Sequence, residues 1–555
     1  MKKVRLDIWA GVTLLAVGIL LLLWKAPRGS AYMDECFYLS LAKRFAQGDR
    51  LLIDEWFISQ PFGFLLIPLM KFYMLVSGKT EGIILTFRYF YVALHLLATA
   101  YLIWRMWKKY QAKALYASFL FLVYVPFNIM SFSYNSMGIT FLLMAGVTLV
   151  TIEAETKGKV LWQILAGVFF AASVLCCPYL LAVYILYVLG VVIYAVKKKN
   201  GRSVKALLFF ILGAGTLALL VLISIVTSPN FSMENLKTCL AYVFTNPTHD
   251  PIGIWSIRVY FQSIYHTMPL VVASILFVVS VVTLKVIVKE KGKYPALIIA
   301  LIYSTYLYFV MKKHVNFCVM PLAYLGIVAF LFTKKKDWKL FGFIYLPSVL
   351  YTFCISLSSN QKDYNIASVL VIASFASILF LLQLFAETKE EKTFSRALCG
   401  AAVLVGIATC VCTTVYYRAT VSFWEVAPLT TRIEAGVQKG LKVPTERAEE
   451  ITAREADATF MRTIPGESVC YIDEKHSAEL FLADDRRNGS FTSYYEGDEG
   501  YLAAMLSAYY VLFPEKKADV LWLSSEMTPD FWEMAMQLED YECVTAPCGA
   551  TVFYR

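Results

Sequence analysis

Apolar runs long enough to cross a lipid bilayer recur along most of the chain, and this repetition constrains the fold more than any other feature. Their interiors carry hardly any charged residues, as expected of helices that face lipid or one another. Hydrophobic residues make up 59% of the 555 residues, and the mean hydropathy of +0.60 is well above that of soluble proteins. The sequence therefore predicts a polytopic α-helical membrane protein.

The hydropathy pattern divides the first three quarters of the chain into thirteen predicted spans. They run over residues 9–24, 85–104, 114–130, 137–152, 160–176, 179–196, 206–226, 267–288, 294–310, 318–332, 340–357, 366–386 and 397–415. Another apolar stretch, residues 62–76, is short and contains Lys71, so we expect it to lie on the membrane surface. Residues 1–417 are assigned to a transmembrane domain, with a first external loop at residues 25–84.

Lysine and arginine residues gather in short loops between the apolar runs. The formal charge of +10 suggests nucleic-acid binding at first sight, but cations divided among loops do not form a binding patch. Cytoplasmic loops of membrane proteins are rich in Lys and Arg, and this rule places residues 197–205 and 333–339 and the N-terminus in the cytoplasm. The first span has no signal-peptide cleavage site after it, so we expect it to be retained. Thirteen spans then put the C-terminus outside the cell membrane.

Residues 418–555 differ from the rest of the chain because none of their apolar runs is long enough to span a membrane. Short runs typical of buried strands lie at 468–473, 519–525, 542–547 and 550–555, and helix patterns lie at 444–464, 501–512 and 529–538. This alternation predicts a small extracytoplasmic α/β domain. Cys470, Cys543 and Cys548 allow one disulfide in an oxidising compartment, and reduced thiols are an equal alternative.

The densest group of carboxylates in the membrane part directly follows the first span. Asp34-Glu35 and Asp54-Glu55 are acidic pairs, and between them a helical pattern ends at Gly48-Asp49. The pattern predicts an amphipathic helix lying along the membrane surface. Asp34, Glu35 and Asp54 are candidate catalytic residues, because a carboxylate there can act as general base toward an acceptor hydroxyl or amine. Asp34 and Glu35 are also the candidates for holding a divalent cation, Glu55 is a candidate substrate contact, and a merely solvated loop is the alternative.

Other candidate substrate contacts lie further along the chain. Arg88 and Lys312-Lys313 are cations expected at the outer ends of spans, where they can bind a phosphate-bearing lipid. For the lysines, side chains that extend to the interface from a helix end are an equal explanation. His249 lies in a long aromatic outer loop, where a turn between two prolines is the simpler interpretation.

The first external loop resembles that of the GT-C superfamily of integral-membrane glycosyltransferases, in particular bacterial relatives of protein O-mannosyltransferase and the lipid A aminoarabinose transferase. The resemblance is carried, in chain order, by Asp34-Glu35, Tyr38, Ala42, Gly48-Asp49, Asp54, the step Gln60-Pro61-Phe62-Gly63, and Arg88. It implies about thirteen transmembrane helices of GT-C type, a polyprenyl-phosphate-linked sugar as donor, and Asp34 as catalytic base with Glu35 assisting. Two positions depart from the pattern: Gln60 stands where relatives often have Lys, and Asn135 where they often have Asp.

The sequence thus predicts a glycosyltransferase that moves a sugar from a polyprenyl-phosphate carrier to an extracytoplasmic glycan, lipid or protein, with Gln60 and Asn135 as further substrate contacts. No P-loop or dinucleotide-binding glycine motif is present, so nucleotide chemistry has no visible site. A flippase for lipid-linked glycans is one alternative, although few polar groups are available to line a route through the spans. A scaffold of the same fold that has lost activity is the other alternative, because Gln60 and Asn135 depart from the pattern.

Overall fold

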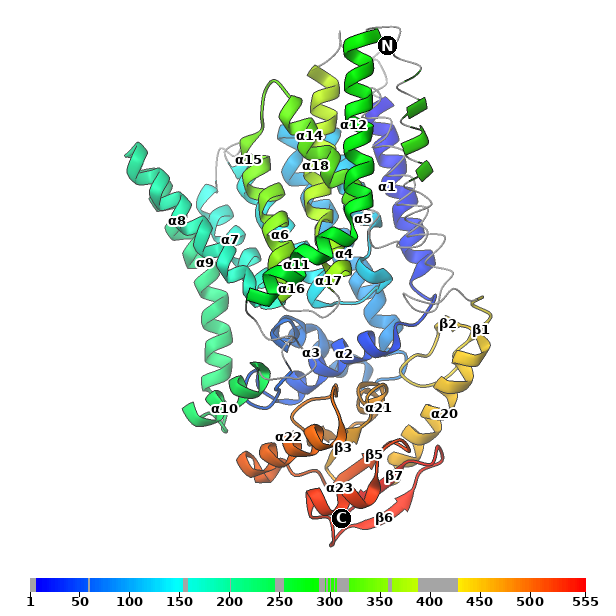
Figure 1. Cartoon of the computed structure of the whole chain (residues 1–555). Coiled ribbons are helices and arrows are strands. Elements are labelled where there is room, and N and C mark those ends of the chain that lie inside the picture. The colour runs from blue at the N-terminus through cyan, green and yellow to red at the C-terminus, as the bar shows by residue number, and fades with distance from the viewer. Residues whose placement is uncertain are drawn as a thin grey trace.

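The computed structural model describes residues 6–57, 60–152, 158–199, 201–244, 254–288, 319–357, 362–387 and 428–555, with a few isolated positions between 295 and 306. In Figure 1 a bundle of long helices occupies one part of the molecule and a small sheet with its helices occupies the opposite end. Helices α2 and α3 lie between these two parts. The predicted architecture, a polytopic helical protein with a small C-terminal α/β unit, is confirmed.

The bundle consists mainly of long apolar helices. They are α1 (Leu6–Lys25), α4 (Ile83–Tyr110), α5 (Lys113–Val123), α6 (Tyr134–Thr151), α7 (Lys159–Cys176), α8 (Leu181–Lys198), α9 (Gly201–Val226), α12 (Met268–Val288), α14 (Met320–Phe332), α16 (Leu346–Leu357), α17 (Lys362–Val369) and α18 (Val371–Glu387). In the described part of the chain nine helical segments are long and apolar enough to cross a membrane, and a bent pair in α11 (Ile254–His266) and α12 would be a tenth. One of the nine is Gln60–Ser77, which contains the stretch expected on the membrane surface. The number thirteen stays a prediction, because the expected span at 397–415 and most of that at 294–310 lie outside the described residues.

One predicted span is shorter than expected. Residues 114–130 were expected to form one helix, but α5 ends at Val123 and a 3-10 turn, η2 (Pro126–Asn128), follows it. Pro126 lacks an N–H group and restricts the residue before it, and Val125 is accordingly extended, with φ −121° and ψ 113°. An eleven-residue helix is only about 16 Å long, roughly half the thickness of a bilayer core.

The basic loops lie together at one end of the bundle. Lys109 Nζ is 2.8 Å from a carboxylate oxygen of Asp337, and the Tyr110 hydroxyl donates to the same side chain. At this end the Tyr116 hydroxyl also donates to the Asp7 carbonyl, near the start of α1. The loop 333–339, expected to be cytoplasmic, and the basic end of α4 therefore share one end of the bundle with the N-terminus. The opposite end carries the C-terminal domain, since the backbone of Gly29, just after α1, donates to the Lys442 carbonyl. Which end faces the cytoplasm stays a prediction.

Helices α7 and α9 approach closely through two glycines. A Cβ atom added to Gly167 would collide with the Phe210 carbonyl oxygen, and one added to Gly213 would collide with the Ile164 carbonyl oxygen. Small residues at such crossings let backbones come into contact, which is a main source of helix association in membranes. The two glycines thereby attach α9 to the bundle.

The C-terminal domain contains a five-stranded mixed sheet in the order β4-β3-β5-β7-β6. Its strands are β3 (Ser468–Ile472), β4 (Arg487–Asn488), β5 (Val520–Leu523), β6 (Glu542–Thr545) and β7 (Thr551–Tyr554), and a separate hairpin pairs β1 (Thr431–Arg432) with β2 (Lys442–Val443). The helices are α20 (Thr445–Met461), α21 (Ser477–Ala483), α22 (Glu499–Leu512) and α23 (Pro529–Met536). All four predicted strands and all three predicted helices are present. Cys470, Cys543 and Cys548 are free thiols, so the reduced alternative holds.

The first external loop folds into a helical layer between bundle and domain. It contains α2 (Tyr32–Gln47), the 3-10 helix η1 (Gln60–Leu66) and α3 (Ile67–Ser77). The beginning of this loop is hydrogen-bonded to the C-terminal domain through Gly29 and the Lys442 carbonyl. Its end is hydrogen-bonded to the same domain, because the backbone N–H of Gly82 donates to the Gly436 carbonyl and that of Ile84 to the Val437 carbonyl. The chain therefore enters and leaves this layer at the same end of the bundle, which is the arrangement expected if residues 62–76 stay on the membrane surface.

Candidate active site at helix α2

Asp34 lies in the first turn of α2 and is partly buried. The Tyr38 hydroxyl, one turn along the same helix, donates a 3.3 Å hydrogen bond to Asp34 Oδ1. Burial raises the pKa of Asp34 to about 6; the Tyr38 hydrogen bond opposes this rise, and the negative charges of Glu35 and Glu496 add to it. A carboxylate with a pKa near 6 is suited to accept a proton near neutral pH.

Aromatic rings from distant parts of the chain surround this carboxylate. The Tyr38 ring lies 5.5 Å from Phe62 of η1 and 6.2 Å from Tyr134 at the start of α6, measured between centroids. From the C-terminal domain, Tyr494 packs 4.8 Å from Phe37. Burial is the main cause of the raised pKa of the Tyr494 hydroxyl, and the negative charges of Asp34 and Glu496 raise this pKa further. The sequence did not reveal Tyr134, Tyr494 and Glu496 as neighbours of Asp34, because they have no local motif and are remote along the chain.

An apolar cavity of about 470 Å³ lies between η1, α3, α4 and α6. Its lining is Leu65, Leu66, Leu69, Tyr91, Leu94, His95, Leu97, Ala98, Tyr101, Phe132, Ser136, Met137, Thr140, Phe141 and Met144. Leu94 and Leu97 are 47% and 64% exposed, so the cavity adjoins the lipid-facing surface of α4. At its other side, the lining residues of η1 and α6 belong to the same helical turns as Phe62 and Tyr134. The cavity lining therefore lies within one helical turn of Phe62 and Tyr134, whose rings pack on Tyr38 beside Asp34.

Glu35 and Arg88 form a buried ion pair that holds the start of α2. The Arg88 Nε and Nη2 atoms lie 2.7 and 2.5 Å from the two Glu35 carboxylate oxygens. The remaining guanidinium N–H groups donate to the carbonyls of Ala26, Arg28 and Gly29, so all five donors have acceptors within the chain. As the structure stands, Arg88 fixes the backbone between α1 and α2 and has no donor left for a lipid phosphate.

The ion pair between Glu35 and Arg88 also decides whether a metal ion fits beside Asp34. Glu35 Oε2 accepts from Arg88 and also from the Ala31 backbone N–H at 3.1 Å, so its lone pairs are directed at donors. A divalent cation between Asp34 and Glu35 would face the Arg88 guanidinium, which repels it. In the described part of the chain no group of three or more His, Cys, Asp or Glu side chains is placed to hold a metal ion. The residues present therefore do not fit a divalent cation at this pair.

The second acidic pair lies beyond the other end of α2 and is engaged in ion pairs. Glu55 Oε2 lies 2.6 Å from Arg44 Nη1, and both side chains are fully buried. Asp54 accepts from the Arg50 backbone N–H at 2.7 Å and lies 3.4 Å from Lys516 of the C-terminal domain. Both carboxylates, expected to be a catalytic residue and a substrate contact, thus serve contacts within the protein in this structure.

Gln60 and Asn135, where the chain departs from the GT-C pattern, flank the aromatic rings beside Asp34. Gln60 is fully buried at the start of η1, and its Oε1 accepts from the Leu52 N–H at 2.8 Å. Among the described residues, Gln60 Nε2 and Asn135 Oδ1 are buried polar atoms without a hydrogen-bond partner. The other predicted contacts, His249, Lys312 and Lys313, lie outside the described residues.

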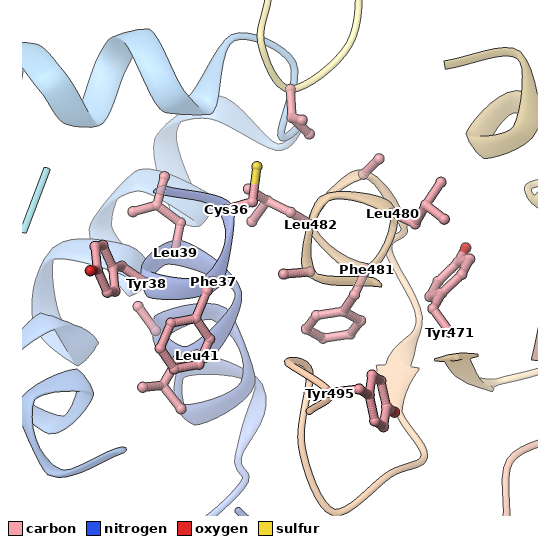
Figure 2. Close-up of a cluster of buried hydrophobic side chains, with 14 of the residues drawn as sticks. Cys36, Phe37, Tyr38, Leu39, Leu41, Tyr471, Leu480, Phe481, Leu482 and Tyr495 are labelled. Atoms are coloured by element: carbon pink, nitrogen blue, oxygen red, sulfur yellow. The ribbon is translucent and has the colours of Figure 1, made fainter. Parts of the chain in front are cut away.

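The helix predicted along the membrane surface is present, and its polar side is covered by the C-terminal domain. Lys43 and Arg44 are among the most buried side chains of the protein, 1% and 0% exposed, because the C-terminal domain packs on this side. Figure 2 shows Cys36 of α2 beside Leu482 of α21, and Tyr38 pointing to the other side of the helix. Helix α2 is therefore enclosed between the bundle and the domain.

No protein-family model and no curated protein sequence matches the chain. Among solved structures, 98% of the chain is similar to 73% of the Archaeoglobus fulgidus oligosaccharyltransferase in complex with Zn and sulfate, at 12% sequence identity and a TM-score of 0.46. The same share is similar to 97% of ArnT from Cupriavidus metallidurans bound to undecaprenyl phosphate, at 10% identity and a TM-score of 0.47. At these identities both similarities concern the fold alone.

Proposed function

We propose that the chain transfers a glycosyl unit from a polyprenyl-phosphate carrier to an acceptor at the extracytoplasmic face of the cell membrane, with Asp34 as general base. The observation that best supports this proposal is the position of Asp34. It lies on the helix enclosed between the bundle and the C-terminal domain, it has no ion pair among the described residues, and its pKa of about 6 suits proton transfer near neutrality.

The cavity between η1, α4 and α6 would hold the first isoprene units of the carrier, because its lining is almost wholly apolar. The head group would then lie at the rings of Phe62 and Tyr134. There the buried amides supply unused hydrogen-bonding atoms: Gln60 Nε2 can donate to a phosphate oxygen, and Asn135 Oδ1 can accept from a sugar hydroxyl. Lys312 and Lys313 remain the proposed cations for the phosphate.

The reaction itself requires one proton acceptor. Asp34 would take the proton of an acceptor hydroxyl or amine as that atom forms its bond to the anomeric carbon, while the bond from this carbon to the phosphate oxygen breaks. Polyprenyl phosphate leaves with the electron pair, and the protonated Asp34 then releases its proton to solvent. Glu35 would act indirectly, since its pairing with Arg88 fixes the first turn of α2 that carries Asp34. No metal ion enters these steps.

The test compares the lipids of cells that produce the wild-type chain with those of cells that produce its Asp34→Asn variant. Extracted polyprenyl-phosphate lipids are quantified by mass spectrometry. The wild type should consume a carrier-linked sugar that accumulates with Asp34→Asn, and Asp540→Asn, at an exposed acid of the C-terminal domain, serves as the matched control. Equal lipid profiles in wild-type and Asp34→Asn cells would exclude catalysis by Asp34 and favour the scaffold alternative.

A further inference from the structure

We infer that Lys43 is a positioning residue of this site: it docks the C-terminal domain onto α2, and only the docked domain holds Asp34 in its buried surroundings. The inference rests on the proposed function for the meaning of Asp34, but its geometry stands apart from any activity.

Lys43 is a buried cation bound to the end of a helix. Its ammonium group donates to the carbonyl of Phe481 at 2.9 Å and to those of Leu482 and Asp484. These carbonyls lie at the C-terminal end of α21, where backbone acceptors lack partners within the helix and the helix dipole favours a positive charge. Burial lowers the pKa of Lys43 to about 8, and the charges of Asp484 and Asp485 oppose that fall. Lys43 thus caps α21 with a side chain from a different part of the protein.

Arg44 continues the same contact on the next position of α2. Its Nη2 donates to the Ser490 carbonyl of the C-terminal domain at 2.7 Å, and its Nε lies 2.7 Å from an Asp49 oxygen. From the other side, Lys516 of the domain lies 2.8 Å from the second Asp49 oxygen. Arg44 and Lys516 lower the pKa of Asp49 despite its burial. The domain therefore docks through alternating buried charges, which are costly to separate.

The docked surface extends along α2 to Asp34. Lys43 lies nine positions after Asp34 on α2, a distance of about 14 Å along the helix. Between them, the Ser40 hydroxyl lies 2.8 Å from that of Ser493, and Phe37 packs on Tyr494. Ahead of α2, Ser30 donates to Gln438 at 2.6 Å. The C-terminal domain thus binds before α2, along it and at its end.

The domain also supplies part of the surroundings of Asp34. The titratable groups around this carboxyl are Glu35 and Tyr38 on α2, Tyr134 on α6, and Tyr494 and Glu496 on the C-terminal domain. Undocking would remove the two domain residues and admit water. Because burial is the main cause of the raised pKa of Asp34, this pKa should then fall toward the ordinary aspartate value of about 4.

The test uses the full chain in detergent and needs no substrate. Carboxyl labelling with a water-soluble carbodiimide, followed at Asp34 by mass spectrometry across pH, gives the titration midpoint. We expect a midpoint near 6 for the wild type and near 4 for Lys43→Met, with about tenfold faster hydrogen exchange over residues 32–47 in the variant. Gln47→Met is the matched control, because Gln47 ends the same helix and reaches the domain only through carbonyls at 3.3 and 3.4 Å.

A rescue experiment separates positioning from general damage. The 2.8 Å between the Ser40 and Ser493 hydroxyls is close enough for a disulfide in the variant Ser40→Cys/Ser493→Cys. Added to Lys43→Met and oxidised, this bond should return the Asp34 midpoint to near 6, and reduction should abolish the return. An unchanged midpoint in Lys43→Met, or no return on oxidation, would overturn the inference. Either result leaves the Asp34→Asn lipid test intact, so the two hypotheses fail separately.

Discussion

Asp34-Glu35 and Asp54-Glu55 occupy the two ends of the α2 region, and their surroundings differ in charge. Glu35 faces Arg88, Glu55 faces Arg44, and Asp54 faces Lys516. Asp34 has no ion pair in the described part of the chain; its hydrogen bond comes from the neutral Tyr38 hydroxyl. Three of the four carboxylates are thus used to hold chain segments together.

The partners of the four acids show which carboxylate of the loop is available for proton transfer. A carboxylate paired with a buried cation cannot be protonated without leaving that cation unpaired, so it is committed to holding the structure. Asp34 is buried enough to have a raised pKa and yet lacks a cation that its protonation would leave behind. Of the four acids it is the one that holds no ion pair in the described part of the chain, so it can take up a proton without leaving a buried cation unpaired.

The largest expected effect is on transfer by Asp34→Asn. This change keeps the size of the side chain and removes the base, so the rate should fall by ~10²–10⁴, about 3–5 kcal/mol of transition-state energy. Thermal stability should be nearly unchanged, because no ion pair is lost. The rate is measured as consumption of carrier-linked sugar in membranes. A variant that turns over normally would remove Asp34 from the catalytic role.

The next effect is on stability, at the other end of α2. Arg44→Met leaves Glu55 and Asp49 as buried carboxylates without their main cation, which should cost roughly 3–5 kcal/mol. The melting temperature of the purified chain, or its midpoint in a mild denaturant, is the measurement. The control is Lys439→Met, which alters an exposed pair with Glu81 and should change little. If Arg44→Met were as stable as the wild type, the ion pairs at this end would not hold the fold.

A smaller effect concerns pH. The basic form of Asp34 is the active one, and its pKa is raised to about 6, so the rate should be low at pH 5 and rise to a plateau above pH 7. At pH 5 about a tenth of the plateau rate should remain, since one pH unit below the pKa leaves roughly that share ionised. A rate that is flat between pH 5 and pH 7 would show that another group limits the reaction.

The local pattern of α2 could be predicted from sequence, but the role of its polar side could not. The apolar spacing and Gly48 correctly define the helix and its end, and Gly48 adopts φ 120°, which favours glycine. Periodicity identifies the polar face without identifying what covers it. The partners of Lys43 and Arg44 in the C-terminal domain lie 438 to 446 positions away in the chain, for example at Phe481 and Ser490.

The same limit applies to the candidate site. The acidic motif locates Asp34, and the α/β pattern of residues 418–555 predicts the strands of the sheet. The contribution of Tyr134 and Tyr494 depends on how α6 and the C-terminal domain meet α2, which is decided by tertiary packing. For Arg88 the sequence suggested a role that its contacts do not require. A cation at the outer end of a span suggests phosphate binding, but in the structure all five guanidinium N–H groups donate to acceptors within the chain.

The smallest expected effect tests the one hydrogen bond that distinguishes Asp34 from the paired acids. Tyr38→Phe keeps a ring against Phe62 and Tyr134 and removes only the hydroxyl that donates to Asp34 Oδ1. That bond favours the charged carboxylate and lowers its pKa, so the pKa should rise above 6 when the bond is lost.

A neutral donor at 3.3 Å contributes about 0.5–1.5 kcal/mol, which corresponds to an upward shift of the rate profile by roughly 0.4–1 pH unit. At pH 6 the variant should therefore be a few-fold slower than the wild type, and on the alkaline plateau the two should be equal. Tyr73→Phe, on α3 away from Asp34, is the matched control and should leave the profile in place. A downward shift, or an equal loss at every pH, would mean that Tyr38 acts on the substrate and not through the charge of Asp34.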